Sequence, residues 1–234
     1  MVHKKCELIL ALDLKSDAEV MPFLARMERA TPYIKIGPRL FASGGVPFLR
    51  SLVDMGYQVF LDIKLHDIPN TVAGAVDYLA GTGLWALTLH TSGGYEMMAA
   101  AREARDGQKS TMKLLGVSVL TSLAGDVWAG VHPGCSLDEA LLLRARTAAS
   151  AGLDGLVCSP MDLERLQGEA SNLLRVVPGI RTGKVGKEDQ QRVATASQAA
   201  QRGADFIVVG RPILEAADPK AAVENILKEL EGER

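Results

Sequence analysis

Short apolar runs alternate with longer polar segments along the whole chain. The runs are rich in Val, Ile and Leu, which is typical of buried parallel strands. The segments between them have the Ala, Leu, Glu and Arg content and the spacing of helices, and several end in a glycine that suits a helix C-cap. The eight predicted strands span residues 7–14, 33–37, 58–65, 85–92, 113–122, 155–160, 173–180 and 206–212.

This order of elements predicts a (β/α)8 barrel. Strands that alternate with helical crossovers run parallel, and eight such units fit a chain of 234 residues. A doubly wound open sheet is the alternative, but that fold often carries a glycine-rich loop after its first strand, and here the first strand leads into DLKSDAEV. No linker or low-complexity tract divides the chain. We therefore expect a single α/β domain, a TIM barrel over residues 1–234.

Composition and charge argue against several classes of function. A net charge of −2 provides no general attraction for nucleic acid. The three cysteines form no CxxC pair and the four histidines show no ligand spacing, which argues against a disulfide framework or a zinc site. The apolar run near the N-terminus is too short for a membrane span and lacks a signal-peptide pattern. We expect a cytoplasmic protein without metal, cofactor, membrane or nucleic-acid partner.

Charged residues interrupt the predicted strands near their carboxyl ends, where (β/α)8 barrels carry their catalytic groups. Alternation along the strand over 58–65 places Asp62 and Lys64 on one face, towards the barrel interior. For these two charges alone, a structural ion pair is as good an explanation as a reaction centre. Lys35 and Asp13, on the two preceding strands, extend the pair to an array and favour the reaction centre.

The last two predicted strands end in glycine and arginine. In many barrels the loops after these strands bind phosphate through backbone N–H groups. In PGIR and VVGRP the glycines allow close approach of the backbone, while Arg181 and Arg211 can add charged hydrogen bonds. Ordinary loop residues are the alternative for either motif alone. The polar segment 182–189, TGKVGKED, is interpreted as a mobile lid or, alternatively, a solvated connector.

Taken together, these motifs resemble the orotidine 5′-monophosphate decarboxylase family, over essentially the whole chain. The D-x-K-x-x-D pattern alone is shared with a wider group of sugar-phosphate decarboxylases and aldolases, whereas Lys35 and the phosphate motifs make the resemblance specific. One departure is VATAS at 193–197, where the family often has Thr-Pro, at a position that starts or extends a helix. The matching motifs are LALD (10–13), IKIG (34–37), FLDIKLHDIPNT (60–71), HTSGG (90–94), LTS (120–122), PGIR (178–181), Gln190-x-Arg192 and VVGRP (208–212).

The resemblance implies conversion of orotidine 5′-monophosphate to UMP and CO2 in pyrimidine biosynthesis, without metal or cofactor. It implies that Lys64 stabilises and protonates a C6 carbanion beside Asp62, Asp67 and Lys35, and that a homodimer forms in which Asp67 and Thr71 reach the partner's site. The implied substrate-binding residues are Asp13, Lys35, Asp62, Thr71, Thr121, Arg181, Gln190, Gly210 and Arg211.

Two alternatives stay open. A related enzyme, 3-keto-gulonate 6-phosphate decarboxylase or hexulose-phosphate synthase, would use Mg²⁺ to stabilise an enediolate. A catalytically silent barrel would bind nucleotides without turnover.

Overall fold

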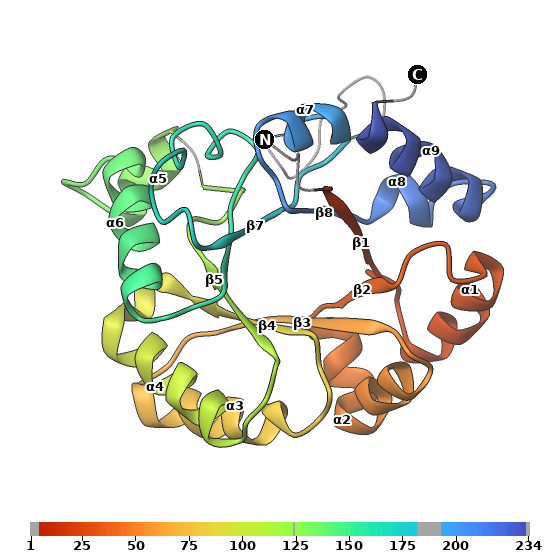
Figure 1. Ribbon diagram of the computed structural model, residues 1–234, viewed down its shortest axis with the longest axis horizontal. Coiled ribbons are helices and arrows are strands. Elements are labelled where there is room, and N and C mark those ends of the chain that lie inside the picture. The colour runs from red at the N-terminus through yellow and green to blue at the C-terminus, as the bar shows by residue number, and fades with distance from the viewer. Residues whose placement is uncertain (1–4, 124, 182–192, 233–234) are drawn as a thin grey trace.

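Eight parallel strands form a closed ring in which each strand pairs with the next and β1 pairs with β8 (Figure 1). The computed structural model describes residues 5–123, 125–181 and 193–232. The predicted (β/α)8 barrel is confirmed. The strands are β1 (Glu7–Ala11), β2 (Tyr33–Ile36), β3 (Gln58–Leu65), β4 (Ala86–His90), β5 (Lys113–Val117), β6 (Gly155–Val157), β7 (Leu174–Val177) and β8 (Phe206–Val209).

Helices form an outer ring around the strands (Figure 1). In the described part of the chain, none of them combines the length and apolar character that crossing a membrane requires. The α-helices are α1 (Val20–Met27), α2 (Pro38–Asp54), α3 (Pro69–Ala80), α4 (Gly94–Gly107), α5 (Gly125–Val131), α6 (Leu137–Ser150), α7 (Ala196–Gln201), α8 (Arg211–Leu214) and α9 (Pro219–Glu231), and the 3-10 turns are η1 (Asp17–Glu19) and η2 (Thr91–Gly93).

Most strands end earlier than their apolar runs predict. β5 stops at Val117 although its run was expected to continue to residue 122. Val119 lies beyond that end, yet it stays buried because it packs against Trp128 and Ala140 in a small separate cluster. Apolar character therefore continues past the last ladder hydrogen bond, and the sequence pattern overestimates the strand.

The alanine-rich segment before β8 forms the helix α7, which begins at Ala196. Thr195 caps its first turn: the Thr195 side chain accepts the Gln198 N–H, and the Gln198 side chain accepts the Thr195 N–H. This bears out the interpretation that 193–197 starts a helix. Residues 190–192 lie outside the described residues.

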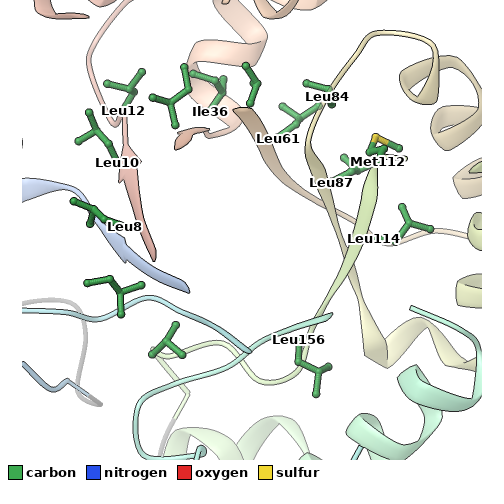
Figure 2. Packing of buried hydrophobic residues seen from close by; sticks show 14 of the residues in the cluster. Leu8, Leu10, Leu12, Ile36, Leu61, Leu84, Leu87, Met112, Leu114 and Leu156 are labelled. Carbon is green, nitrogen blue, oxygen red and sulfur yellow. The ribbon is translucent and has the colours of Figure 1, made fainter. Parts of the chain in front are cut away.

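The main core lies between the strands and the helices. Leu8, Leu10 and Leu12 are buried and point away from the barrel axis (Figure 2). Ile9 and Ala11 alternate with them and belong to a second cluster inside the barrel. Each strand therefore separates its side chains into an outer packing layer and an inner layer that can support a site.

Aromatic side chains fill the amino-terminal end of the barrel. The rings of Tyr33, Trp85 and Phe206 contact one another with centroids 4.9–5.2 Å apart, and Phe60 packs edge-on against Trp85 at 6.2 Å. We call these four residues the aromatic floor. Because they occupy the lower part of the interior, space for a ligand is left at the carboxyl ends of the strands.

Candidate active site

A cavity of about 220 Å³ opens above the aromatic floor, at the carboxyl ends of the strands. Phe60, Val117, Val157 and Val208 provide apolar lining, and polar side chains from β2, β3 and the segments that follow β1, β5, β7 and β8 face it. The cavity thus combines an apolar base with a charged rim. The predicted site residues that line it are Asp13, Lys35, Asp62, Lys64, Thr121, Arg181, Gly210 and Arg211.

Four charges of alternating sign connect β2 and β3 with the segment that follows β1. Lys64 Nζ lies 2.8 Å from Asp62 Oδ1, and Lys35 Nζ lies 3.7 Å from Asp62 Oδ2 and 3.2 Å from Asp13 Oδ1. The side chains of Lys35 and Asp62 are only 12% and 13% exposed. We call Asp13, Lys35, Asp62 and Lys64 the charge array. Its geometry confirms that these residues come together, as the sequence predicted.

Asp62 is held in its charged form by its neighbours. Burial favours the neutral acid and raises its pKa, but the charges of Lys35 and Lys64 and hydrogen bonds from Lys64 and Thr88 outweigh burial and leave the pKa below its ordinary value. The carboxylate is therefore ionised at neutral pH. It presents a fixed negative charge beside the Lys64 ammonium, which is one-third exposed towards the cavity.

The backbone of β3 departs from regular geometry where it carries the array. Lys64 has a φ of +52°, in the left-handed region that costs a non-glycine residue about 1–2 kcal/mol. The register against β4 shifts between Leu61 and Leu65. Simple alternation predicted the correct face for Asp62 and Lys64, but it did not predict this bulge.

Thr88 on β4 is a site residue that the sequence interpretation missed. Its hydroxyl donates to Asp62 Oδ1 at 3.0 Å and accepts the Lys64 backbone N–H at 2.9 Å. Thr88 is completely buried. One signal was available: in ALTLH, Thr88 shares its face with Ala86, which belongs to the cluster inside the barrel.

The two glycine–arginine motifs lie together at the cavity, as expected. Gly179 adopts a φ of +82°, which suits glycine, and Arg181 follows it. Gly210 precedes α8, and a Cβ added there would approach Ala11 Cβ to 3.4 Å and Asp13 Oδ2 to 3.5 Å. Glycine therefore keeps the space between this loop and the charge array open.

The loop after β7 is pinned at its base. The Arg181 N–H donates to Ala194 O at 3.0 Å, and the Ala194 N–H donates to Gly179 O at 3.2 Å. Gln190 and the segment 182–189, predicted as a phosphate contact and a lid, lie between these anchors but outside the described residues.

Asp67 and Thr71 are not brought to the cavity of the single chain. Both are exposed, and neither contributes to the described lining. Asp67 Oδ1 accepts the Ile68 N–H at 2.7 Å, just before α3 begins. Their predicted role in a partner's site stays a prediction.

Two histidines lie close to each other at the carboxyl ends of β3 and β4. The rings of His66 and His90 are 5.2 Å apart. Burial lowers the pKa of His90, and the positive charges of His66, Lys64 and Arg144 lower it further, against a weaker opposing effect of Asp62. His90 is therefore neutral at pH 7. Within residues 5–123, 125–181 and 193–232, His, Cys, Asp and Glu side chains form no group of three that could hold a metal ion.

Comparison with known proteins identifies relatives over nearly the full length. Residues 7–226 match the model of the orotidine 5′-phosphate decarboxylase / HUMPS family. The chain is 44% identical to orotidine 5′-phosphate decarboxylase of Opitutus terrae, over 96% of this chain and 98% of the relative. It is 40% identical to the Pseudomonas putida enzyme of the same name, over 96% and 97%.

A solved structure shows the same fold. The crystal structure of orotidine 5′-phosphate decarboxylase from Lactobacillus acidophilus superimposes with a TM-score of 0.86 at 35% identity, covering 96% of this chain and 99% of that one. The family match, the relatives and the barrel agree over the same residues. The chain belongs to the orotidine 5′-phosphate decarboxylase / HUMPS family.

Proposed function

We propose that this protein decarboxylates orotidine 5′-monophosphate to UMP and CO2 in pyrimidine biosynthesis. The observation that carries the proposal is the charge array, with Lys64 at its end, facing the two glycine–arginine loops across one cavity. The relatives at 40% and 44% identity bear the name of this activity. In this proposal the charge array carries out catalysis, and the two glycine–arginine loops bind the phosphate of the substrate.

The substrate extends from the array to the loops. Arg181, Gly210 and Arg211 hold the phosphate together with Gln190, because arginine forks and backbone N–H groups suit a dianion. Asp13 and Lys35 hold the ribose hydroxyls at the side of the cavity nearest β1 and β2. Thr121, in the loop after β5, contacts the edge of the pyrimidine. This orientation brings C6 to Lys64.

The reaction needs electrostatic stabilisation from the protein. When the bond from C6 to the carboxylate breaks, the electron pair stays on C6, where no adjacent carbonyl or imine can accept it. The Lys64 ammonium stabilises that charge and then donates a proton to C6, which gives UMP. Asp62, held ionised 2.8 Å away, favours the charged form of the lysine. Solvent returns a proton to the amine.

A second copy of the chain completes the site in this proposal. Asp67 and Thr71 from the partner complete each cavity. The exposed surface that carries them supports this, since Ile68 is 67% exposed beside Asp67 and Tyr78 is 63% exposed on α3. Large apolar side chains at such exposure are common at interfaces between protein chains.

We further propose that the enzyme works in the cytoplasm. Cys6, Cys135 and Cys158 are all free thiols, which is the usual state in a reducing compartment.

One assay tests the function. The absorbance of orotidine 5′-monophosphate is followed with time, in the presence and absence of EDTA. We expect equal rates of conversion to UMP in both. Binding of UMP without turnover would instead favour the silent barrel. EDTA-sensitive turnover of a sugar phosphate, with no turnover of the nucleotide, would favour the Mg²⁺-dependent relatives.

A further inference from the structure

The bulge in β3 leaves part of its backbone without regular partners. Leu61 pairs with Leu87 and Leu65 pairs with Leu89, so four residue steps on β3 match two on β4. Asp62, Ile63 and Lys64 therefore oppose Thr88 alone. Extra residues in a bulge lose their ladder hydrogen bonds, and a buried N–H without a partner is destabilising.

The Thr88 hydroxyl replaces the missing ladder partner of Lys64. It accepts the Lys64 backbone N–H at 2.9 Å. A hydroxyl has one proton to donate, and here it is directed to Asp62 Oδ1 at 3.0 Å. Complete burial of Thr88 excludes water as a substitute for either bond.

The same carboxylate oxygen also accepts the Lys64 ammonium at 2.8 Å. A closed circuit results, in which the Lys64 backbone binds Thr88, Thr88 binds Asp62, and Asp62 binds the Lys64 side chain. The ammonium of Lys64 therefore binds Asp62 Oδ1 directly, and its backbone N–H is linked to the same oxygen through the Thr88 hydroxyl. The circuit holds a residue whose backbone has a positive φ, a conformation that persists only when its surroundings enforce it.

We propose that Thr88 is a positioning residue, whose hydroxyl fixes Lys64 and Asp62 in the geometry that decarboxylation requires. This rests on the proposed function. Thr88 lies outside the described lining of the cavity, so it acts through its two neighbours. Neither of them holds the phosphate in the proposed complex. Loss of the hydroxyl should therefore lower kcat and leave KM nearly unchanged.

Two substitutions test the role of the hydroxyl. Thr88→Val keeps the shape of the side chain and removes the hydroxyl, whereas Thr88→Ser keeps the hydroxyl and removes a methyl group. Losing one hydrogen bond to a charged group should lower kcat for orotidine 5′-monophosphate about ten- to hundredfold in Thr88→Val. Thr88→Ser should stay within about threefold of wild type, by the same reasoning.

Thr31 offers a matched control at the opposite end of the barrel. It is buried, its hydroxyl donates to Leu8 O at 2.8 Å, and it accepts the Tyr33 N–H at 3.4 Å. Like Thr88→Val, Thr31→Val removes one hydrogen bond that the hydroxyl donates and one that it accepts, but at a position away from the cavity. We expect it to lower the melting temperature without changing kcat, which separates loss of stability from loss of positioning.

The outcomes distinguish the two proposals. If wild type does not convert the nucleotide, the proposed function fails. If wild type is active and Thr88→Val keeps its kcat, the positioning role is wrong. Equal loss of kcat in Thr88→Val and Thr88→Ser would assign the effect to packing and would also overturn it. A fall in kcat with unchanged KM in Thr88→Val, restored in Thr88→Ser, supports the proposal.

Discussion

Lys64 donates a hydrogen bond from its ammonium to Asp62, two residues earlier on the same strand, across 2.8 Å. The contact spans a bulge in which Lys64 has a φ of +52°. In a regular strand the side chains of Asp62 and Lys64 would point to the same face, but the backbone alone would not fix the distance between the carboxylate and the amine. The bulge and the ion pair together aim the amine into the cavity.

Lys64→Ala should fold and lose nearly all decarboxylation. In the proposed mechanism it removes both the charge that stabilises the carbanion and the proton donor, so we expect kcat to fall by at least about 10⁴-fold. Steady-state assays with orotidine 5′-monophosphate and a thermal melt check this. Lys113→Ala is the control, because Lys113 is 41% exposed and pairs with Asp154 at the start of β5. Activity near wild type in Lys64→Ala would remove this lysine from its central role.

Arg211→Ala should mainly weaken binding of the substrate. In the proposed complex the Arg211 guanidinium gives charged hydrogen bonds to the phosphate, and their loss should raise KM about ten- to hundredfold. The comparison is Arg202→Ala, whose side chain pairs with Glu164 at 3.2 Å and does not line the described cavity. An unchanged KM in Arg211→Ala would mean that the phosphate binds elsewhere.

Mixing two inactive variants tests the shared site. In the proposed dimer, Lys64→Ala lacks the acid in its own site, and Asp67→Ala lacks the carboxylate that we assign to the partner's site. In an equal mixture after subunit exchange, half of the dimers are hybrids with one intact site, so about a quarter of wild-type activity should return.

The control for this mixture is Lys64→Ala with Asp62→Ala. Asp62 contacts Lys64 within one chain, so their hybrids contain no intact site and should stay inactive. Recovery in the control, or none in the first mixture, would contradict the assignment of Asp67 to the partner.

His90 should make stability depend on pH below about 6.5. Its pKa in the folded state lies below the ordinary value of 6.5, so the unfolded chain binds more protons in that range. The contribution of His90 is complete above pH 6.5 and is lost as pH falls towards the folded pKa. Urea unfolding from pH 8 to pH 5 should therefore show a steeper loss in wild type than in His90→Gln. Parallel curves would contradict this.

Gly155→Ala should destabilise the barrel. A Cβ at this position in β6 would lie 2.8 Å from Leu115 Cδ2 and 2.9 Å from the backbone oxygen of Leu174. Because a backbone atom cannot rotate away, we expect a loss of about 1–3 kcal/mol in the free energy of unfolding. Gly107→Ala, where an added Cβ meets nothing within 4 Å, should be close to neutral. Chemical denaturation compares the two.

The barrel and most of its rim could be predicted because both depend on local patterns. Alternation on single strands, with the rule that strand ends carry the site, was enough to bring Asp13, Lys35 and Lys64 together. Thr88 could not be assigned in this way, since its role depends on the register between β3 and β4. Register describes how two strands pair, so it cannot be predicted from the residue pattern of either strand alone.

Other features depend on more than the single chain. The proposed place of Asp67 and Thr71 in a partner's site would depend on the surface of a second copy, and no pattern within one chain can fix it. The early ends of the strands have a simpler cause: residues such as Val119 stay apolar after the ladder has ended, because they pack in a cluster of their own.

The aromatic floor also determines where substrate can enter the barrel and where product can leave it. Tyr33, Trp85 and Phe206 fill the amino-terminal end of the barrel, and Phe60 lines the base of the cavity above them. Orotidine 5′-monophosphate therefore enters through the same opening by which UMP departs. In the part of the chain that the structure describes, the cavity opens at the carboxyl ends of the strands, so product and incoming substrate compete for the same opening.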